Sequence, residues 1–128
     1  MTKKNKILTA KDFLQKKKII EENTNNLFTS KIFDGDIMVS EEIPPSEIME
    51  IMSDDSLTEY EQYVRLVYTC CPIFKDEDFR QDLEMKEPYD VVKNVFKRTG
   101  AEVYELGNFI LTLYGFLDAD LVEKVKKQ

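Results

Sequence analysis

The stretch that decides the fold is AEVYELGNFILTLY, residues 101–114, the longest helical pattern in the chain that is apolar on nearly every side. At helical spacing its hydrophobic residues cover most of the circumference and leave only a narrow polar strip of Glu105, Asn108 and Thr112. Such a helix has to be covered by several neighbours. We therefore predict a central helix at 101–114, with Gly100 and Gly115 at helix ends because glycine readily adopts a left-handed backbone.

A capping pattern predicts a first helix near the amino terminus. Thr9 is a suitable N-cap, and Asp12 follows three residues later, where its carboxylate can reach back to the cap. The segment ENTNN (22–26) ends the helical pattern because asparagine favours turns. One face of this helix is predicted to consist of Phe13, Leu14, Ile19 and Ile20.

Residues 27–40 carry the only β signal in the chain. Asp34-Gly35 separates two short strand patterns and suits a two-residue type I′ turn, whose central positions both need positive φ. In that register Ile32 faces Ile37. A lone hairpin is marginally stable in water, so its apolar face is expected to pack on helices.

Two further helices are predicted between the hairpin and residue 72. Ser56 to Glu59 reads as a capping box for a helix of about four turns that Pro72 stops. Pro44-Pro45 starts a shorter helix before it. The inner positions of that shorter helix are predicted to be Ile48, Met49 and Met52.

The carboxy-terminal half continues this pattern of short helices. Asp76 is a predicted cap, Pro88 suits the first turn of the next helix, and residues 117–125 form a last amphipathic pattern. We predict a mainly α fold: a compact bundle of about six or seven helices around the central helix (101–114), with one small β-hairpin near residues 27–40. Residues 1–8 are expected to be mobile, and residues 9–128 to form a single domain.

Composition limits the classes of partner. The chain has 128 residues, of which 42% are hydrophobic and 34% charged, and a formal charge of -7. Nucleic acids and anionic membranes are bound through basic surfaces, so neither is expected as the main partner. No apolar run reaches 18 residues, and the amino terminus does not resemble a signal peptide, which predicts a cytosolic protein.

The charges are unevenly distributed along the chain. Residues 1–22 contain seven lysines and three acidic residues, whereas residues 32–64 contain ten acidic residues and no lysine or arginine. Runs of charged residues like these usually lie on the surface and interact only with solvent. The alternative is a dipolar surface that selects or steers a binding partner.

The sequence contains little that supports catalysis. Histidine, the commonest general base, is absent, and the four glycines are isolated, so no loop resembles a phosphate-binding motif. Cys70 and Cys71 are adjacent, which favours two buried thiols over a disulfide, a redox pair or a metal site. Asp76-Glu77-Asp78 is the nearest approach to a cation site but lacks the glycine and final glutamate of a calcium loop. We predict no enzyme, no catalytic residue, no metal and no cofactor.

Residues 75–116, KDEDFRQDLEMKEPYDVVKNVFKRTGAEVYELGNFILTLYGF, resemble the XkdN-like tail assembly chaperones of tailed phages and prophages. The shared features are a short acidic helix, a helix led by Pro88, Gly100 with Glu102, and Gly115-Phe116 after the central helix. The likeness extends more weakly to the order of elements in residues 9–52. Ala101 departs from the family pattern, which has glycine directly before the glutamate.

The resemblance implies a non-enzymatic assembly factor in the cytoplasm of a bacterial host. Such a chaperone coats the long tape measure protein of the tail, keeps it soluble, and leaves as the tail tube protein displaces it, so it is absent from the virion. The family supplies no residue list for the interface. Candidate partner-binding residues are therefore apolar residues left over once the central helix is covered, although each is more often core: Phe13, Leu14, Phe28, Phe33, Phe116, Leu117 and Leu121.

Two other classes of function stay open from the residues alone. An acidic inhibitor or DNA mimic would present the carboxylates of residues 34–62 to a basic protein, and it needs them on one continuous face. A small enzyme with paired carboxylates would need close acids in an apolar cleft. Self-association is also open, because apolar surface for a second copy looks the same in a sequence as apolar surface for a client.

Overall fold

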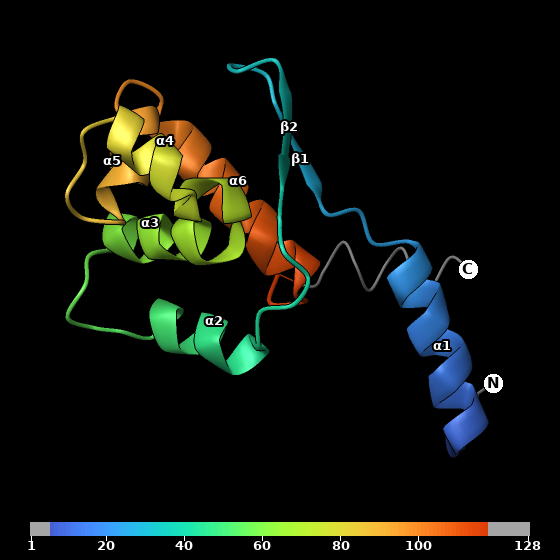
Figure 1. Ribbon diagram of the computed structural model, residues 1–128. Coiled ribbons are helices and arrows are strands. Elements are labelled where there is room, and N and C mark those ends of the chain that lie inside the picture. The colour runs from blue at the N-terminus through green and yellow to red at the C-terminus, as the bar shows by residue number, and fades with distance from the viewer. Residues whose placement is uncertain (1–5, 118–128) are drawn as a thin grey trace.

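The computed structural model describes residues 6–117. Within this range it forms six α-helices, one short 3-10 helix and one two-stranded antiparallel hairpin (Figure 1), which confirms the predicted fold class. The predicted helix at 117–125 falls outside the described residues, apart from its first position. In chain order the elements are α1 (Ala10–Glu22), β1 (Leu27–Ser30), β2 (Gly35–Met38), α2 (Pro45–Met52), α3 (Glu59–Cys70), η1 (Pro72–Lys75), α4 (Glu77–Asp82), α5 (Asp90–Val95) and α6 (Gly100–Leu113).

The core is built on α6, which packs along α3. The buried residues of α6 lie on the face expected from their spacing, whereas Glu105 and Asn108 are exposed and Thr112 is half-buried. This confirms the predicted central helix and its polar strip. Helices α2 and α5, the 3-10 helix and the hairpin complete the core around the following residues: Val39, Ile48, Val64, Leu66, Val67, Cys70, Cys71, Phe74, Val91, Val92, Phe96, Val103, Leu106, Ile110 and Leu111.

Gly107 allows α3 and α6 to approach closely. A Cβ at this position would lie 2.2 Å from Cδ1 of Tyr63, so the Tyr63 ring occupies the space that any other side chain would need. The Tyr63 hydroxyl donates a hydrogen bond of 2.8 Å to Oδ1 of Asn108, and its ring lies 4.9 Å from that of Tyr104. The helix pair is therefore locked in one register.

The two glycines that flank the central helix behave differently. Gly115 has φ 81°, and the hydrogen bonds Gly115 N–H to Thr112 O (3.0 Å) and Phe116 N–H to Leu111 O (2.7 Å) form a Schellman motif, as predicted for a helix end. Gly100 is instead the first residue of α6, and α5 already ends at Val95. Gly100 therefore begins a helix, and the prediction that it ends one was wrong.

Two of the predicted helix caps are confirmed. Thr9 and Asp12 form a capping box, in which the Thr9 hydroxyl accepts from the Asp12 N–H (3.2 Å) and the Asp12 carboxylate accepts from the Thr9 N–H (2.9 Å). Asp76 accepts from the N–H groups of Asp78 (2.9 Å) and Phe79 (3.3 Å) at the start of α4. The carboxylates of Asp12 and Asp76 therefore accept hydrogen bonds from backbone N–H groups at the amino-terminal ends of helices.

The cap of α3 lies two residues later than predicted. Thr58 is the N-cap, and its hydroxyl accepts from the N–H of Glu61 at 3.2 Å. Ser56 instead donates from both its backbone N–H (3.0 Å) and its hydroxyl (2.5 Å) to Oδ1 of Asp54. The predicted capping box at Ser56 was wrong because this serine is engaged in a turn with the preceding aspartate.

The hairpin exists, but its register differs from the prediction. Phe28 pairs with Ile37 and Ser30 with Gly35, so the loop comprises residues 31–34 and Asp34 alone adopts the left-handed conformation, with φ 54°. The predicted pairing of Ile32 with Ile37 was wrong. Tertiary contacts favour the observed register, because Phe28 packs against Phe109 of α6 with ring centroids 5.7 Å apart.

Helix α2 packs on the core through a slightly different face than predicted. Ile48 is fully buried, and Met52 is half-buried, as expected. Met49, however, is 50% exposed, and Ile51 takes its place against the core. The exposed side of α2 therefore combines one apolar residue with glutamates.

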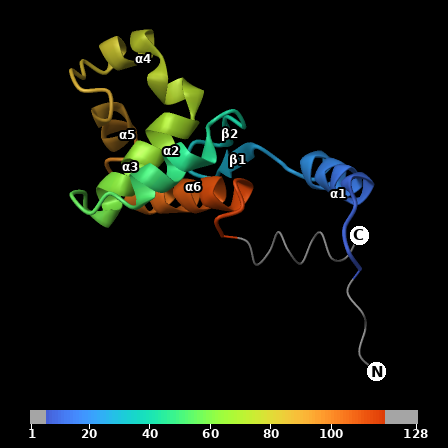
Figure 2. The same cartoon turned by 90° about the horizontal axis from the view of Figure 1, so that it is seen from below.

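Helix α1 projects away from the helical body except at its last turn, which lies near the end of α6. In both views it lies beyond the hairpin, joined to β1 by a short connection (Figures 1 and 2). None of its residues is buried, and Phe13 and Leu14 are 62% and 68% exposed. Neither residue is part of the core, so both remain candidates for partner binding.

Candidate functional site

The first candidate surface is a shallow apolar hollow of about 420 Å³ along α1, which we call the arm groove. It is lined by Leu8, Asp12, Phe13, Lys16, Lys17, Ile20 and Glu21. Residues 13, 16, 17 and 20 share one side of the helix, because positions three and four apart are neighbours on a helix surface. The arm groove therefore combines an apolar strip with two lysines.

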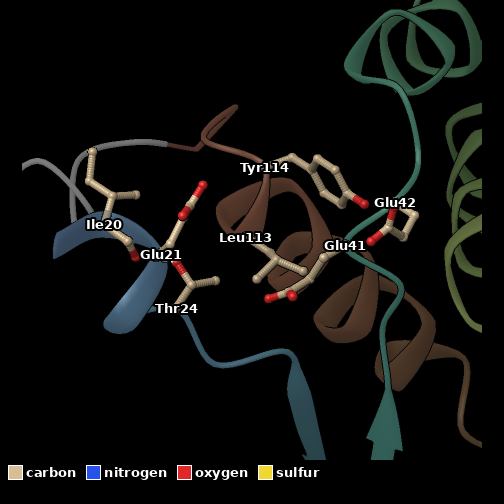
Figure 3. A pocket seen from close by; sticks show the side chains of 7 residues that line it. All are labelled: Ile20, Glu21, Thr24, Glu41, Glu42, Leu113 and Tyr114. Atoms are coloured by element: carbon tan, nitrogen blue, oxygen red, sulfur yellow. Dashed lines mark hydrogen bonds between the residues drawn. The ribbon is translucent and has the colours of Figure 1, made fainter. Parts of the chain in front are cut away.

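The second is a hollow of about 520 Å³ at the carboxyl end of α6, which we call the end hollow (Figure 3). Three segments that are distant in the sequence meet there: the last turn of α1, the connection after β2, and the end of α6. Its lining consists of Ile20, Glu21, Thr24, Glu41, Glu42, Leu113 and Tyr114. Because Ile20 and Glu21 also line the arm groove, the two hollows adjoin.

Tyr114 holds one wall of the end hollow in place. Its hydroxyl donates to the carbonyl of Ser40 (2.5 Å) and accepts from the N–H of Ile43 (3.1 Å). The Ser40 N–H in turn donates to the carbonyl of Cys70 at 2.7 Å. Burial raises the pKa of the Tyr114 hydroxyl, so it stays protonated and can donate at neutral pH. The segment that carries Glu41 and Glu42 is thus bound to the ends of both α3 and α6.

The lining of the end hollow combines acidic and apolar side chains. Glu21, Glu41 and Glu42 come from two segments, and no lysine or arginine is among the lining residues. Leu113, Ile20 and the Tyr114 ring supply the apolar surface (Figure 3). A helix or extended segment with apolar side chains and a lysine or arginine beside them is complementary to this lining.

The structure does not bring the sequence-derived candidates together in one surface. Phe13 lines the arm groove, whereas Leu14 is exposed outside it. Phe116 and Leu117 follow α6 and are 36% and 45% exposed. Leu121 lies outside the described residues.

The two hairpin candidates pack against the helical body. Phe28 contacts Phe109, and Phe33 meets Phe96 edge to face at 5.7 Å, although Phe33 remains 53% exposed. Phe28 is therefore part of the hairpin's packing. Phe33 lies in the hairpin loop and is not among the residues that line the end hollow.

Sequence reasoning missed most of the end hollow. Glu41 and Glu42 belong to the acidic run, but nothing in the run distinguishes them from its other acids. Leu113 and Tyr114 read as ordinary residues of the central helix. The only available signal was that acidic and apolar residues occur together at the ends of segments. This signal does not indicate which segments lie next to each other in the fold.

The described residues offer no arrangement suited to metal binding, since they contain no group of three or more potential ligands. Cys70 and Cys71 are free thiols buried in the core, and burial raises the pKa of Cys70 to about 12 and that of Cys71 further still. A thiolate is therefore strongly disfavoured at neutral pH. No helix in the described part of the chain is long and apolar enough to cross a membrane.

Comparison with known proteins supplies no family and no residue roles. The chain matches no family model, and neither the curated proteins nor the solved structures contain a match to it.

Proposed function

We propose that this chain is a tail assembly chaperone of a phage or prophage, which acts in the cytoplasm of the bacterial host. It binds helical segments of the tape measure protein, keeps that protein soluble, and is displaced by the tail tube protein. The proposal rests on the sequence resemblance and on one structural observation. The end hollow combines acidic and apolar side chains in one lining, as expected of a surface that binds an amphipathic segment.

The proposal assigns client binding to the end hollow. An amphipathic helix would place its apolar stripe on Ile20, Leu113 and Tyr114 and its lysines or arginines toward Glu41 and Glu42. Only part of the client would be covered at each site. Such a small, partly polar interface favours rapid release, which displacement by the tube protein requires.

The acidic-inhibitor alternative has less structural support. The acids of residues 34–62 are distributed over the hairpin, the connection after β2, α2, the following turn and α3. They therefore come from several elements with different orientations (Figure 1). A mimic of a nucleic-acid backbone needs an extended, regular row of charges.

The test is co-expression of this chain with the tape measure protein, which is expected to be the product of a large gene downstream. We expect the long protein to become soluble and to co-purify with the chain at moderate salt. Glu41→Lys/Glu42→Lys reverses two charges of the end hollow and is expected to reduce the co-purified client by about tenfold, as like charges repel. Asp82→Lys/Glu105→Lys, an equal charge change on exposed residues outside the hollow, is the matched control.

Two results would contradict the proposal. The first is a long partner that stays insoluble with the unaltered chain. The second is an equal loss of client with the two double variants, which would mean that only the total charge of the chain matters. Circular dichroism of both variants confirms that they keep their helices before the comparison is made.

A further inference from the structure

The described part of the chain ends beside the end hollow. Leu113 and Tyr114, the last residue of α6 and its C-cap, line the hollow, and Leu117 follows only three residues after the cap (Figure 3). The Leu117 N–H donates to the carbonyl of Leu111 at 3.3 Å, so the chain is held at the last turn of α6 up to this residue. The segment of residues 118–128 therefore starts from a point next to the hollow.

This short connection favours the segment over any partner from solution as the occupant of the hollow. A chain spans at most about 3.3–3.6 Å per residue, so the fourth residue beyond Leu117 stays within about 14 Å of it. A segment held by so short a connection has an effective concentration on the order of millimolar at its site. Even a weak affinity for the lining is then sufficient for binding.

The sequence of residues 118–128 suits the lining. The segment carries three acidic residues in its first half and three lysines in its second half. Leu121 and Lys124 lie three residues apart and share one side of a helix, whereas Lys126 falls on the opposite side. Asp120 lies four residues before Lys124, but an exposed pair at this spacing is weak and leaves the lysine available. The segment thus offers an apolar side chain with a lysine beside it.

Two carboxylates of the hollow lack a cationic partner. Glu21 is paired with Lys17 at 2.5 Å. Glu41 and Glu42, in contrast, form no ion pair among residues 6–117. No lysine or arginine is among the described residues that line the hollow. A lysine from beyond these residues would relieve the repulsion between the two adjacent glutamates.

We propose that residues 118–128 bind the end hollow of their own chain. Leu121 packs on the apolar part of the lining, and Lys124 lies beside Glu41 and Glu42. The hollow is then covered in the free chain, and a client has to displace the segment before it binds. This last step rests on the proposed function, whereas the docking of the segment does not.

A spin label on the full chain tests the docking. Glu123→Cys places a thiol on the side of the segment opposite Leu121, and both natural cysteines are buried, so a nitroxide attaches at position 123. We expect the nitroxide to broaden the methyl signals of Leu113 and Ile20. Adding Leu121→Asp should reduce this broadening severalfold, because the released segment is near the hollow only part of the time. Equal broadening with and without Leu121→Asp would overturn the proposal.

A matched pair of charge variants locates the contact. In the spin-labelled chain, Lys124→Glu and Lys126→Glu change the net charge equally, but only position 124 shares a side with Leu121. We expect Lys124→Glu to reduce the broadening and Lys126→Glu to leave it nearly unchanged. Combining Lys124→Glu with Glu41→Lys/Glu42→Lys restores opposite charges and should recover the broadening. Equal effects of the two lysine substitutions, or no recovery in a chain that circular dichroism shows to be folded, would overturn the assigned contact.

A mixed sample separates binding within one chain from exchange between two. Isotope-labelled chain without the nitroxide is combined with unlabelled chain that carries it. We expect the methyl signals of Leu113 to stay sharp in the dilute mixture. Broadening in the mixture would mean that the segment of a second copy fills the hollow, and it would overturn docking within the chain.

Competition with a client is measured separately. Leu121→Asp uncovers the hollow and is expected to raise the apparent affinity for the tape measure protein severalfold, because the free chain no longer has to release its own segment. Loss of broadening with an unchanged client affinity would overturn the competition and leave the docking in place. A tape measure protein that binds neither chain would contradict the proposed function, whereas the spin-label result would still decide the docking.

Discussion

At the scale of single residues, Gly107 is a position at which one added methyl group is expected to destabilise the fold. The new Cβ of Gly107→Ala would meet Cδ1 of Tyr63 at 2.2 Å and Cε1 at 2.7 Å, so the half-buried ring has to move from its position against Tyr104. We expect a loss of about 1–3 kcal/mol in the free energy of unfolding, measured by urea denaturation. Gly100→Ala is the control, because nothing lies within 4 Å of its added Cβ. Equal stability of the two variants would contradict the close packing of α3 and α6.

Ser30 and Glu102 form a buried polar contact between the hairpin and α6. The Ser30 hydroxyl donates to the Glu102 carboxylate, which is only 4% exposed, and it accepts from the Phe33 N–H at 3.0 Å. Ser30→Ala is expected to lower the free energy of unfolding by about 1–3 kcal/mol, because it leaves buried groups without a partner. Thr29→Ala removes an exposed hydrogen bond on the same strand and should cost much less. A similar loss from both, again in urea, would argue against the buried contact.

At the scale of elements, α1 depends on its amino-terminal cap. A hydrogen bond from the Lys6 side chain, followed by the bonds with Thr9, lowers the pKa of Asp12 to about 2. Since this pKa is below its ordinary value of 3.8, the stabilisation is complete above about pH 4 and is lost as the pH falls toward 2. Carbon chemical shifts of α1 should show its helicity decline in that range. In the Asp12→Asn variant, the helicity of α1 reported by these shifts should be lower at neutral pH and should not decline between pH 4 and 2.

The hairpin shows how an element can be predicted while its register is missed. Asp34-Gly35 is a strong local turn signal, and a turn does form there. The register of the two strands is instead determined by tertiary contacts. In the observed register Phe28 packs against Phe109, and Ser30 forms a hydrogen bond with Glu102. These partners are more than 70 residues away along the chain, so no local pattern contains them.

At the scale of the whole molecule, stability is expected to be uneven. Helices α3 and α6 carry most of the buried core, whereas α1 contributes no buried residue. In dilute protein, amide hydrogen exchange should therefore be slowest in α3 and α6, at rates set by global unfolding, and fast in α1. Exchange in α1 as slow as in α6 at these concentrations would contradict the isolated position of α1.

The elements themselves were predictable because their signals are local. The apolar circumference of residues 101–114, the caps at Thr9 and Asp76, and the Gly115 helix end all depend on residues a few positions apart. The lack of histidine is likewise a property of composition alone. Backbone geometry and side-chain size act over this short range, so the sequence is sufficient for such predictions.

The tertiary structure decided which surfaces stay uncovered. The amphipathic pattern at Phe13 and Ile20 predicts a buried face, yet whether a neighbour reaches that face depends on how the whole chain packs. The end hollow joins Ile20, Glu41 and Leu113, whose proximity arises only when the segment after β2 is bound by Tyr114. Contacts between distant segments depend on the sum of many packing interactions, and no local sequence pattern determines that sum.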